Sequence, residues 1–148
     1  FPQWVEQPRK YTKEDLEEAL GLNILETYQS SKTFVIIKSP EQVKTYAPDI
    51  AKIKCLKDTL GIVITAQGDD NTDFVSRLFA PQIGIDEDPV TGAIHCFLTP
   101  YWAEKLGKTT LNAKQLSARG GDLLCTLKGD RVEISGNAVL YLKGSINV

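Results

Sequence analysis

The segment from Thr91 to Leu106 predicts a helix that is apolar around most of its surface. Thr99 and Pro100 interrupt the pattern, and Thr99 is expected to cap a restarted turn before Gly107 ends the helix. A helix at the surface would carry an apolar stripe on one side only. This helix is therefore expected inside the molecule, wrapped by a sheet, which favours an α+β fold.

Most of the remaining chain predicts strands separated by turns, with a few short helices in the first third. Thr12 and Asp15 are spaced as a helix cap, and Gly21 is placed to stop that helix. Pro2 and Pro8 make residues 1–10 an extended lead-in. Further helices are expected at 39–46 and 49–58, a turn at 68–71, and strands at 23–30, 33–38, 61–66, 73–81, 111–118, 122–128, 131–135 and 139–148.

Length and charge restrict the class of protein. The chain has 148 residues, enough for one domain with a sizeable core, and a net charge of −2. Its lysines and arginines form no basic run, so neither nucleic acid nor an anionic membrane is expected as a partner. The apolar stretch 61–66 is far shorter than a membrane span, and no signal peptide is visible, so a cytoplasmic location is expected.

Cysteine and histidine usage argues against a metal site. Cys55, Cys96 and Cys125 are odd in number and widely separated, which disfavours a zinc site or a disulfide framework and favours a reducing compartment. A histidine-rich metal site is excluded because His95 is the only histidine. Cys96 is expected to be a small buried side chain, and His95 to take part in packing or in a capping bond.

An acidic loop, 83–88, leads into the apolar helix. Backbone N–H groups of Thr91, Gly92 and Ala93 would be unpaired there, and the positive end of the helix dipole would add to their attraction for an anion. Asp88 lies nearest the helix, with its backbone fixed by Pro89, so it could carry a proton or orient a substrate. The alternative is a capped strand-to-helix connection without a ligand.

Three further charged features have a structural and a functional interpretation. Asp86 and Glu87 could have only a structural role, in which the positive end of the helix dipole attracts their carboxylates. Arg119, followed by Gly120 and Gly121, could present an arginine and a glycine backbone to an anion, or form a hairpin with a solvated arginine. Arg77 is expected to form a structural ion pair with the acidic loop.

Several of these motifs occur together and in order, and their combination resembles the phenazine-biosynthesis-like (PhzF-like) isomerase family. The resemblance covers the chain from about residue 61 onward, whereas residues 1–60 agree in layout more than in motif. The motifs that carry it include Asp73-Phe74-Val75-Ser76-Arg77, Glu87-Asp88-Pro89-Val90-Thr91-Gly92, Pro100-Tyr101-Trp102-Ala103, Gln115-Leu116-Ser117 and Arg119-Gly120-Gly121. The specific part is the combination of Glu-Asp-Pro-Val-Thr-Gly with the later Tyr-Trp and Arg-Gly-Gly.

The resemblance implies a two-domain protein with halves related to the diaminopimelate epimerase fold. Each half would wrap a mixed or antiparallel, barrel-like sheet around a central helix, and substrate would bind between the halves. Residues 1–148 look like the second, C-terminal domain alone, with 1–10 leading in from the other. The chain contains no methionine and begins at Phe1, which fits that expectation. The N-terminal half would be a partner and would supply a catalytic glutamate.

The resemblance also implies a chemistry: isomerisation or epimerisation of a small carboxylate-bearing substrate by proton transfer, without a cofactor. Asp88 matches the family's catalytic acidic residue, and Thr91 and Gly92 match the nest for the substrate carboxylate, with Arg119, Gly120 and Gly121 as further binding residues. The family usually has serine where Ala93 stands, so a hydroxyl is missing. This departure keeps a non-catalytic binding module open as an alternative.

Two further expectations concern chemistry and assembly. A racemase with paired cysteines is disfavoured, because no Cys-Gly-Thr follows the acidic loop and Cys96 lies within the helix. A single half would expose the apolar face that normally meets the other half, so self-association into a homo-oligomer, such as a dimer, is expected.

Overall fold

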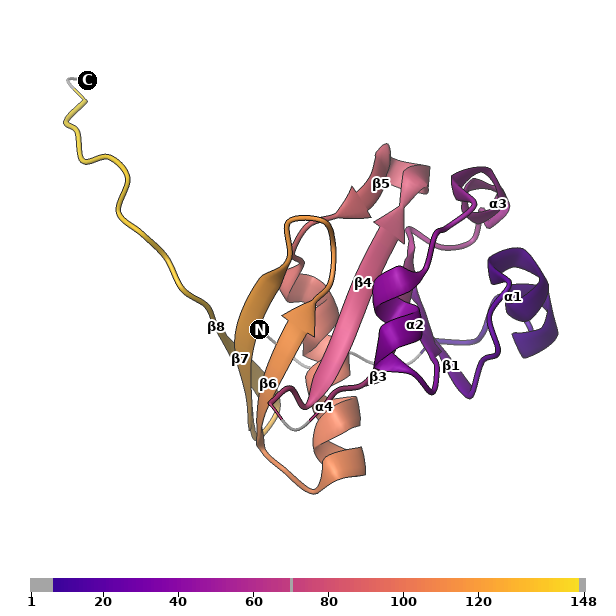
Figure 1. Ribbon diagram of the computed structural model, residues 1–148, viewed down its shortest axis with the longest axis horizontal. Helices are drawn as coiled ribbons and strands as arrows, with labels where there is room; N and C mark the ends of the chain where they lie inside the picture. Colours follow the sequence, from indigo (N-terminus) through magenta and orange to yellow (C-terminus); the bar gives the residue numbers. More distant parts are fainter. Residues whose placement is uncertain (1–6, 70, 147–148) are drawn as a thin grey trace.

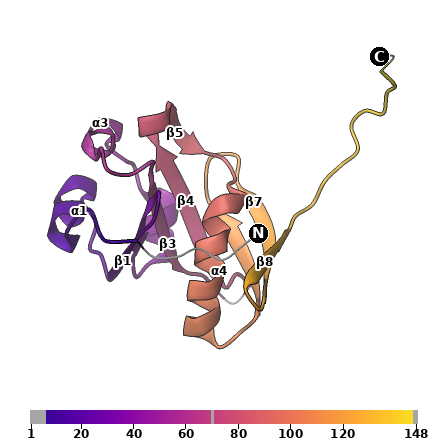
Figure 2. The ribbon, with the colours of Figure 1, turned by 180° about the vertical axis from the view of Figure 1, so that it is seen from behind.

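The computed structural model describes residues 7–69 and 71–146 as one α+β unit, a mixed sheet with helices on both faces (Figures 1 and 2). Residues 1–6 of the predicted lead-in, Asp70 of the predicted turn and residues 147–148 of the predicted last strand lie outside the described residues. The elements are α1 Lys13–Leu20, β1 Glu26–Gln29, β2 Thr33–Ile36, α2 Pro40–Thr45, α3 Ile50–Cys55, β3 Ile62–Gln67, β4 Phe74–Ala80, a 3₁₀ turn Pro81–Ile83, β5 Ile85–Asp88, α4 Gly92–Leu106, β6 Thr110–Gln115, β7 Gly121–Lys128 and β8 Arg131–Ser135.

The strands follow the order β1-β2-β3-β4-β6-β7-β8, with β5 paired to β4 beside this path. β2 with β3 and β4 with β6 are parallel, and the other pairs are antiparallel, so the prediction of a mixed sheet is confirmed. The predicted start and end of the first helix are confirmed. Thr12 and Asp15 form a reciprocal capping box, and Gly21 ends α1 in the left-handed conformation.

Helix α4 lies against the concave face of the sheet, as its apolar surface predicted. Ile94 and Leu98 are fully buried in a cluster that includes side chains of β2, β3, β4, β6 and β7. At one edge of the sheet, the ring of Tyr28 in β1 lies 5.3 Å from that of Phe97. At the other edge β8 also contacts α4. The sheet therefore curves around the helix (Figure 2).

A second core fills the opposite face of the sheet, under α1, α2 and α3. Leu16, Val43 and Ile53 of these helices are buried there together with Val35 and Phe79 of the sheet. Because side chains alternate along a strand, neighbouring residues of β2 and β4 belong to different cores. This alternation decides which face each charged side chain of the sheet region occupies.

The predicted interruption of the apolar helix at Thr99 is wrong. α4 continues through Pro100, and Thr99 is buried inside it. A proline within a helix removes one backbone hydrogen bond and costs about 3 kcal/mol or more. Leu98 and Trp102, on either side of the proline, are buried in the sheet-facing core, and this packing outweighs the local preference.

The acidic loop is not a loop. Ile85–Asp88 forms β5, which pairs with the second half of β4, with an irregular register between Leu78 and Ala80. The predicted strand 139–148 is also wrong over its described part, because residues 136–146 form an extended tail without strand pairing (Figure 1). The predicted strand is missing there because the tail pairs with no strand of the described chain.

Candidate functional site

The candidate site forms where one edge of β4 is shared by two strands. Phe74 to Ser76 pair with β6, whereas Leu78 and Ala80 pair with β5. The ends of β5 and β6 therefore meet beside the middle of β4. Asp88 is the last residue of β5 and Gln115 is the last residue of β6, so this junction brings them together at the start of α4.

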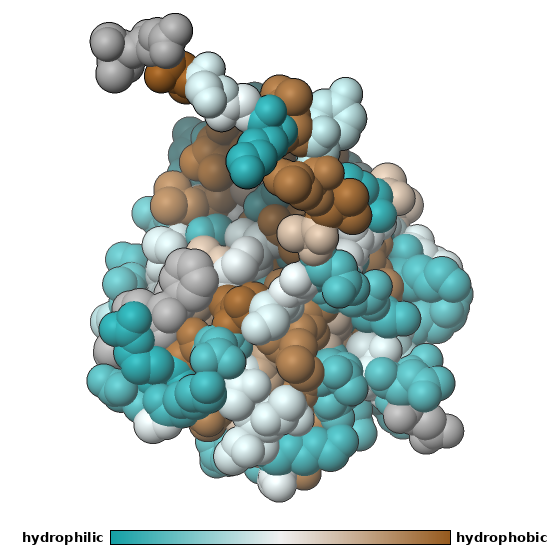
Figure 3. Space-filling model, turned by 90° about the vertical axis from the view of Figure 1, so that its left-hand side faces the viewer, coloured by the Kyte–Doolittle hydropathy of each residue, from teal (hydrophilic) through white to brown (hydrophobic). Residues whose placement is uncertain are grey.

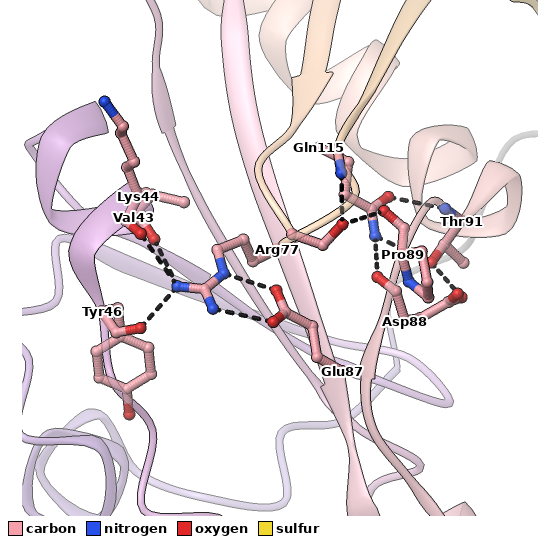
Figure 4. A network of polar contacts seen from close by, with 11 residues as sticks. Val43, Lys44, Tyr46, Arg77, Glu87, Asp88, Pro89, Thr91 and Gln115 are labelled. Atoms are coloured by element: carbon pink, nitrogen blue, oxygen red, sulfur yellow. Dashed lines mark hydrogen bonds and ion pairs between the residues drawn. The ribbon is translucent and has the colours of Figure 1, made fainter.

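Gln115 joins the two strand ends to the helix (Figure 4). Its side chain is fully buried. The Nε2 group donates to the carbonyl oxygen of Asp88 at 2.8 Å and to Oγ1 of Thr91 at 3.3 Å. Its Oε1 atom accepts from the backbone N–H of Thr91 at 2.8 Å. Sequence alone indicated Gln115 only as part of a motif, because its contacts with Asp88 and Thr91 depend on strand register.

The predicted anion nest needs a correction at Thr91. Gln115 occupies the backbone N–H of that residue, and the Thr91 hydroxyl donates to the carboxylate of Asp88. Thr91 therefore holds the site together and does not offer its amide to a ligand. Gly92 and Ala93 are the first two helical residues of α4, where backbone N–H groups have no partner within a helix.

Gly92 differs from the other glycines near the site. A Cβ atom added at Gly92 would meet nothing within 4 Å, and its φ is not in the left-handed region. At Gly121 an added Cβ would lie 2.5 Å from Cγ2 of Val90, and Gly120 has a φ of +68°. Packing and backbone conformation thus require glycine at 120 and 121, whereas neither requires it at 92.

The Arg119 loop lies next to the start of α4, where Gly121 packs against Val90, and its polar groups bind within the fold. Ser117 Oγ donates to the carbonyl oxygen of Pro89 at 2.6 Å and accepts from the N–H of Gly120 at 3.1 Å. The Gly120 amide is therefore not turned toward an anion. Arg119 is exposed and lines two open hollows of about 400 and 360 Å³, one on each side of the loop.

Glu87 and Asp88 point to opposite faces of the sheet (Figure 4). Glu87 accepts two hydrogen bonds from Arg77, at 2.7 and 3.0 Å. The predicted ion pair of Arg77 is thus confirmed, whereas a contact of Glu87 with the positive end of α4 is wrong. Arg77 Nη1 also donates to the carbonyl oxygens of Val43, Lys44 and Tyr46, which fixes the end of α2 against β4.

His95, Cys96 and Cys125 are buried and behave as structural groups. Nδ1 of His95 lies 2.8 Å from the carbonyl oxygen of Thr91, so Nδ1 carries the proton, and burial lowers the pKa of the ring to about 4. Burial raises the pKa of the Cys96 thiol, and that of Cys125 to about 11. Both thiols stay protonated at neutral pH, which argues against a cysteine racemase. In residues 7–69 and 71–146, no three His, Cys, Asp or Glu side chains group to hold a metal ion.

A third hollow, of about 470 Å³ and thus larger than the two beside Arg119, lies away from this junction. It is lined by Asn112, Lys114, Asp122, Leu124 and Ser135 on the side of β6–β8 that faces away from α4. None of the predicted site residues lines it. The volume of a hollow alone would therefore favour this other position. The polar groups that converge at Asp88 instead favour the junction of β5, β6 and α4 as the candidate site.

Comparison with known proteins agrees with this arrangement. The family model described as phenazine biosynthesis-like protein matches residues 3–144. The chain belongs to the phenazine biosynthesis-like family. An uncharacterized isomerase of Pseudomonas aeruginosa is 47 % identical over 147 residues, covering 95 % of this chain and 56 % of that protein.

Solved structures of the phenazine biosynthesis-like family have the same fold. A PhzF-family protein of Enterococcus faecalis is 41 % identical with a TM-score of 0.87, and the chain covers 56 % of its length. A PhzC/PhzF protein of Clostridium difficile is 44 % identical with a TM-score of 0.85, again over 56 % of its length. The chain thus spans about half the length of these relatives. Among the described residues, no helix has the length and apolar character needed to cross a membrane.

Proposed function

We propose that the chain forms one wall of the active site of an isomerase or epimerase that transfers a proton on a small carboxylate-bearing metabolite, without a cofactor. The observation that carries this proposal is the placement of Asp88. Its half-buried carboxylate lies on the α4 face of the sheet and accepts a hydrogen bond from the Thr91 hydroxyl. An oriented carboxylate that accepts hydrogen bonds can take a proton from a substrate carbon.

The start of α4 provides a second part of the site. Gly92 and Ala93 have N–H groups without helical partners, and the helix dipole makes this end positive. The open space beside Gly92 would let a ligand approach the backbone closely. We propose that these two amides stabilise the negative charge that develops on the substrate when Asp88 removes a proton.

The rest of the site is proposed to come from a second domain. The chain covers about half the length of its relatives. The two relatives from P. aeruginosa are named isomerases. We propose that this chain is the C-terminal domain of a protein with two diaminopimelate epimerase-like halves, that residues 1–10 connect the halves, and that the other half supplies the catalytic glutamate.

Hydrogen exchange in a two-domain protein tests the role of Asp88. The chain would be joined to the remaining part of the P. aeruginosa isomerase and incubated in D₂O with a panel of small hydroxy and unsaturated carboxylic acids. Loss of proton signal at the carbon near the carboxylate would be followed by NMR. We expect Asp88→Asn to slow the exchange by roughly 10²-fold or more. The exposed Asp86→Asn is the matched control; equal rates for Asp88→Asn and the unmodified protein would refute the proposal.

The alternative, a binding module without catalysis, is favoured by one observation: Ala93 offers no hydroxyl at the start of α4. Such a module would bind small carboxylates but would exchange no substrate proton in the same experiment. Retention of binding without exchange, in a chimera that carries the other half, would therefore favour the module.

Self-association is a further proposal. Val139, Leu140, Tyr141 and Leu142 of the tail are each at least 78 % exposed, and the tail stands out from the body of the molecule (Figure 3). Apolar segments exposed in this way favour association with another protein surface. We propose that the tail binds the other half or a second copy; analytical ultracentrifugation of the chain with and without residues 137–148 tests the homo-oligomer.

A further inference from the structure

Thr91 uses its side chain differently from the residues that begin the other helices. Thr12, Ser39 and Asp49 occupy the N-cap positions of α1, α2 and α3, and each accepts a hydrogen bond from an amide of its own helix. Thr91 occupies the same position in α4 but makes no such bond. Its hydroxyl bonds to two side chains outside the helix instead. The Thr91 side chain therefore belongs to the candidate site and not to the cap of its own helix.

The directions of these hydrogen bonds follow from the backbone of Thr91 (Figure 4). Its N–H can only donate, and Oε1 of Gln115 accepts from it at 2.8 Å. This bond fixes the orientation of the Gln115 amide, so the group that lies 3.3 Å from Oγ1 of Thr91 is the donor Nε2. The hydroxyl oxygen accepts there, and its single proton is donated to Oδ2 of Asp88. The hydrogen bonds thus run in one direction and end on one oxygen of Asp88.

The backbone of Thr91 is held on both sides. Gln115 binds its N–H, and Nδ1 of His95 donates to its carbonyl oxygen at 2.8 Å. Gln115 and His95 are both fully buried. Threonine is branched at Cβ, so few χ1 rotamers are open to it once its backbone is fixed. The hydroxyl therefore keeps its direction toward Asp88.

The two carboxylate oxygens of Asp88 differ as a result. Oδ2 accepts from Thr91, whereas no group in residues 7–69 and 71–146 donates a hydrogen bond to Oδ1. A hydrogen bond draws electron density from the oxygen that accepts it, so Oδ1 is the better base of the two. Because Thr91 also restricts rotation of the carboxylate, Oδ1 has a defined position.

We propose that Thr91 is a positioning residue that makes Oδ1 the reacting oxygen of Asp88. This inference rests on the proposed function and deepens it by naming the atom that carries the proton. Oδ1 takes the proton from the substrate carbon, the electron pair of the C–H bond stays on the substrate, and Asp88 becomes a neutral acid. Oδ2 is then the carbonyl oxygen of that acid and still accepts from Thr91. Oδ1 can therefore return the proton to the substrate from the same position, which restores the carboxylate.

The side-chain order of Asp88 in the 148-residue chain tests this role without a ligand. Three-bond couplings measured by NMR give the χ1 populations of Asp88. We expect one staggered rotamer in the unmodified chain and in Thr91→Ser, which keeps the hydroxyl, but at least two in Thr91→Val. Thr91→Val keeps the shape of the side chain, and Gln115 can still bind the N–H of residue 91 and the carbonyl oxygen of Asp88.

Thr99→Val is the matched control for this measurement. Thr99 is buried in the same helix, and its hydroxyl oxygen has no hydrogen-bond partner among the described residues. Its replacement should leave the Asp88 rotamer unchanged. Several Asp88 rotamers in the unmodified chain, or a single one in Thr91→Val, would overturn the inference.

Kinetics of the two-domain protein separate positioning from binding. For the acid of the panel that the unmodified protein exchanges fastest, Thr91→Val should lower kcat roughly tenfold and leave KM unchanged. Thr91→Ser should recover most of this loss, and an equal loss in Thr99→Val would overturn the inference. The proposed function fails separately: it falls if Asp88→Asn keeps full hydrogen exchange, whereas an unchanged kcat in Thr91→Val removes only the role of Thr91.

Discussion

Glu87 and Asp88 are neighbouring carboxylates at the end of one short strand, yet their surroundings differ completely. Glu87 points to the face covered by α2, where Arg77 binds both of its oxygens. Asp88 points to the α4 face, where one carboxylate oxygen accepts from Thr91 and the side chain remains half-exposed. The alternation of a strand thus separates a structural acid from one that can meet a substrate.

The two faces also differ in what their polar groups hold together. On the α2 face, Arg77 donates to three backbone carbonyls as well as to Glu87, so its donors are consumed within the fold. On the α4 face, Gln115 fixes Asp88 through its backbone and leaves the carboxylate for other contacts. A group whose position is set through its main chain can keep its side chain available for chemistry.

The largest effect is expected at Arg77. Arg77→Met leaves a partly buried Glu87 carboxylate and three carbonyls without their donor, so the free energy of unfolding should fall by about 3 kcal/mol or more. Urea denaturation measures this change. Lys128→Met, which breaks the exposed pair with Glu133, should cost less than about 1 kcal/mol. A similar small loss at Arg77 would mean that the α2 face is not the structural side of the strand.

Low pH should reduce the free energy of unfolding through His95, which is buried in α4. His95 is neutral when folded, with a pKa of about 4 against a usual 6.5. Below pH 6.5 the unfolded chain binds a proton that the folded chain binds only near pH 4, so unfolding becomes easier by about 3 kcal/mol across that window.

The matched variant is His95→Asn, which can keep the donor to the Thr91 carbonyl but does not titrate. Urea denaturation at several pH values between 7 and 4 measures the difference between the two chains, in which the shared carboxylates cancel. Parallel pH profiles would show that His95 contributes nothing to acid sensitivity.

Local sequence signals predicted much of this arrangement. The capping residues of α1, the β-branched run of β3 and the apolar surface of α4 each specify their structure through short-range or burial preferences. The errors have a common origin. Pro100 stays helical, 85–88 becomes a strand and 139–146 remains unpaired because each outcome depends on which distant segment packs beside it.

The candidate site could also be predicted only where its residues are close in the sequence. Asp88 and the start of the helix adjoin in sequence, and Gly120 and Gly121 are typical of a turn. Gln115 reaches the site only through strand register, which no local pattern contains. The occupation of the Thr91 amide was likewise hidden, since Gln115 lies 24 residues away.

The smallest predicted effect on stability concerns that occupied amide. Gln115→Met keeps the approximate volume of the side chain but removes its bonds to the Thr91 N–H and the Asp88 carbonyl. Two part-buried backbone groups then lose their partners, and we expect the free energy of unfolding, measured by urea denaturation, to fall by roughly 2 kcal/mol. Amide hydrogen exchange at Thr91 should accelerate at the same time.

Gln82→Met is the control, because Gln82 donates to the carbonyls of Ile53 and Leu56 on the opposite side of the sheet. It should lower global stability by a comparable amount, yet any change in Thr91 exchange should follow that global loss alone. If Gln115→Met leaves Thr91 as protected as in the unmodified chain, the amide has another partner. The proposed anion site at the start of α4 would then have to be assigned again, starting from Gly92.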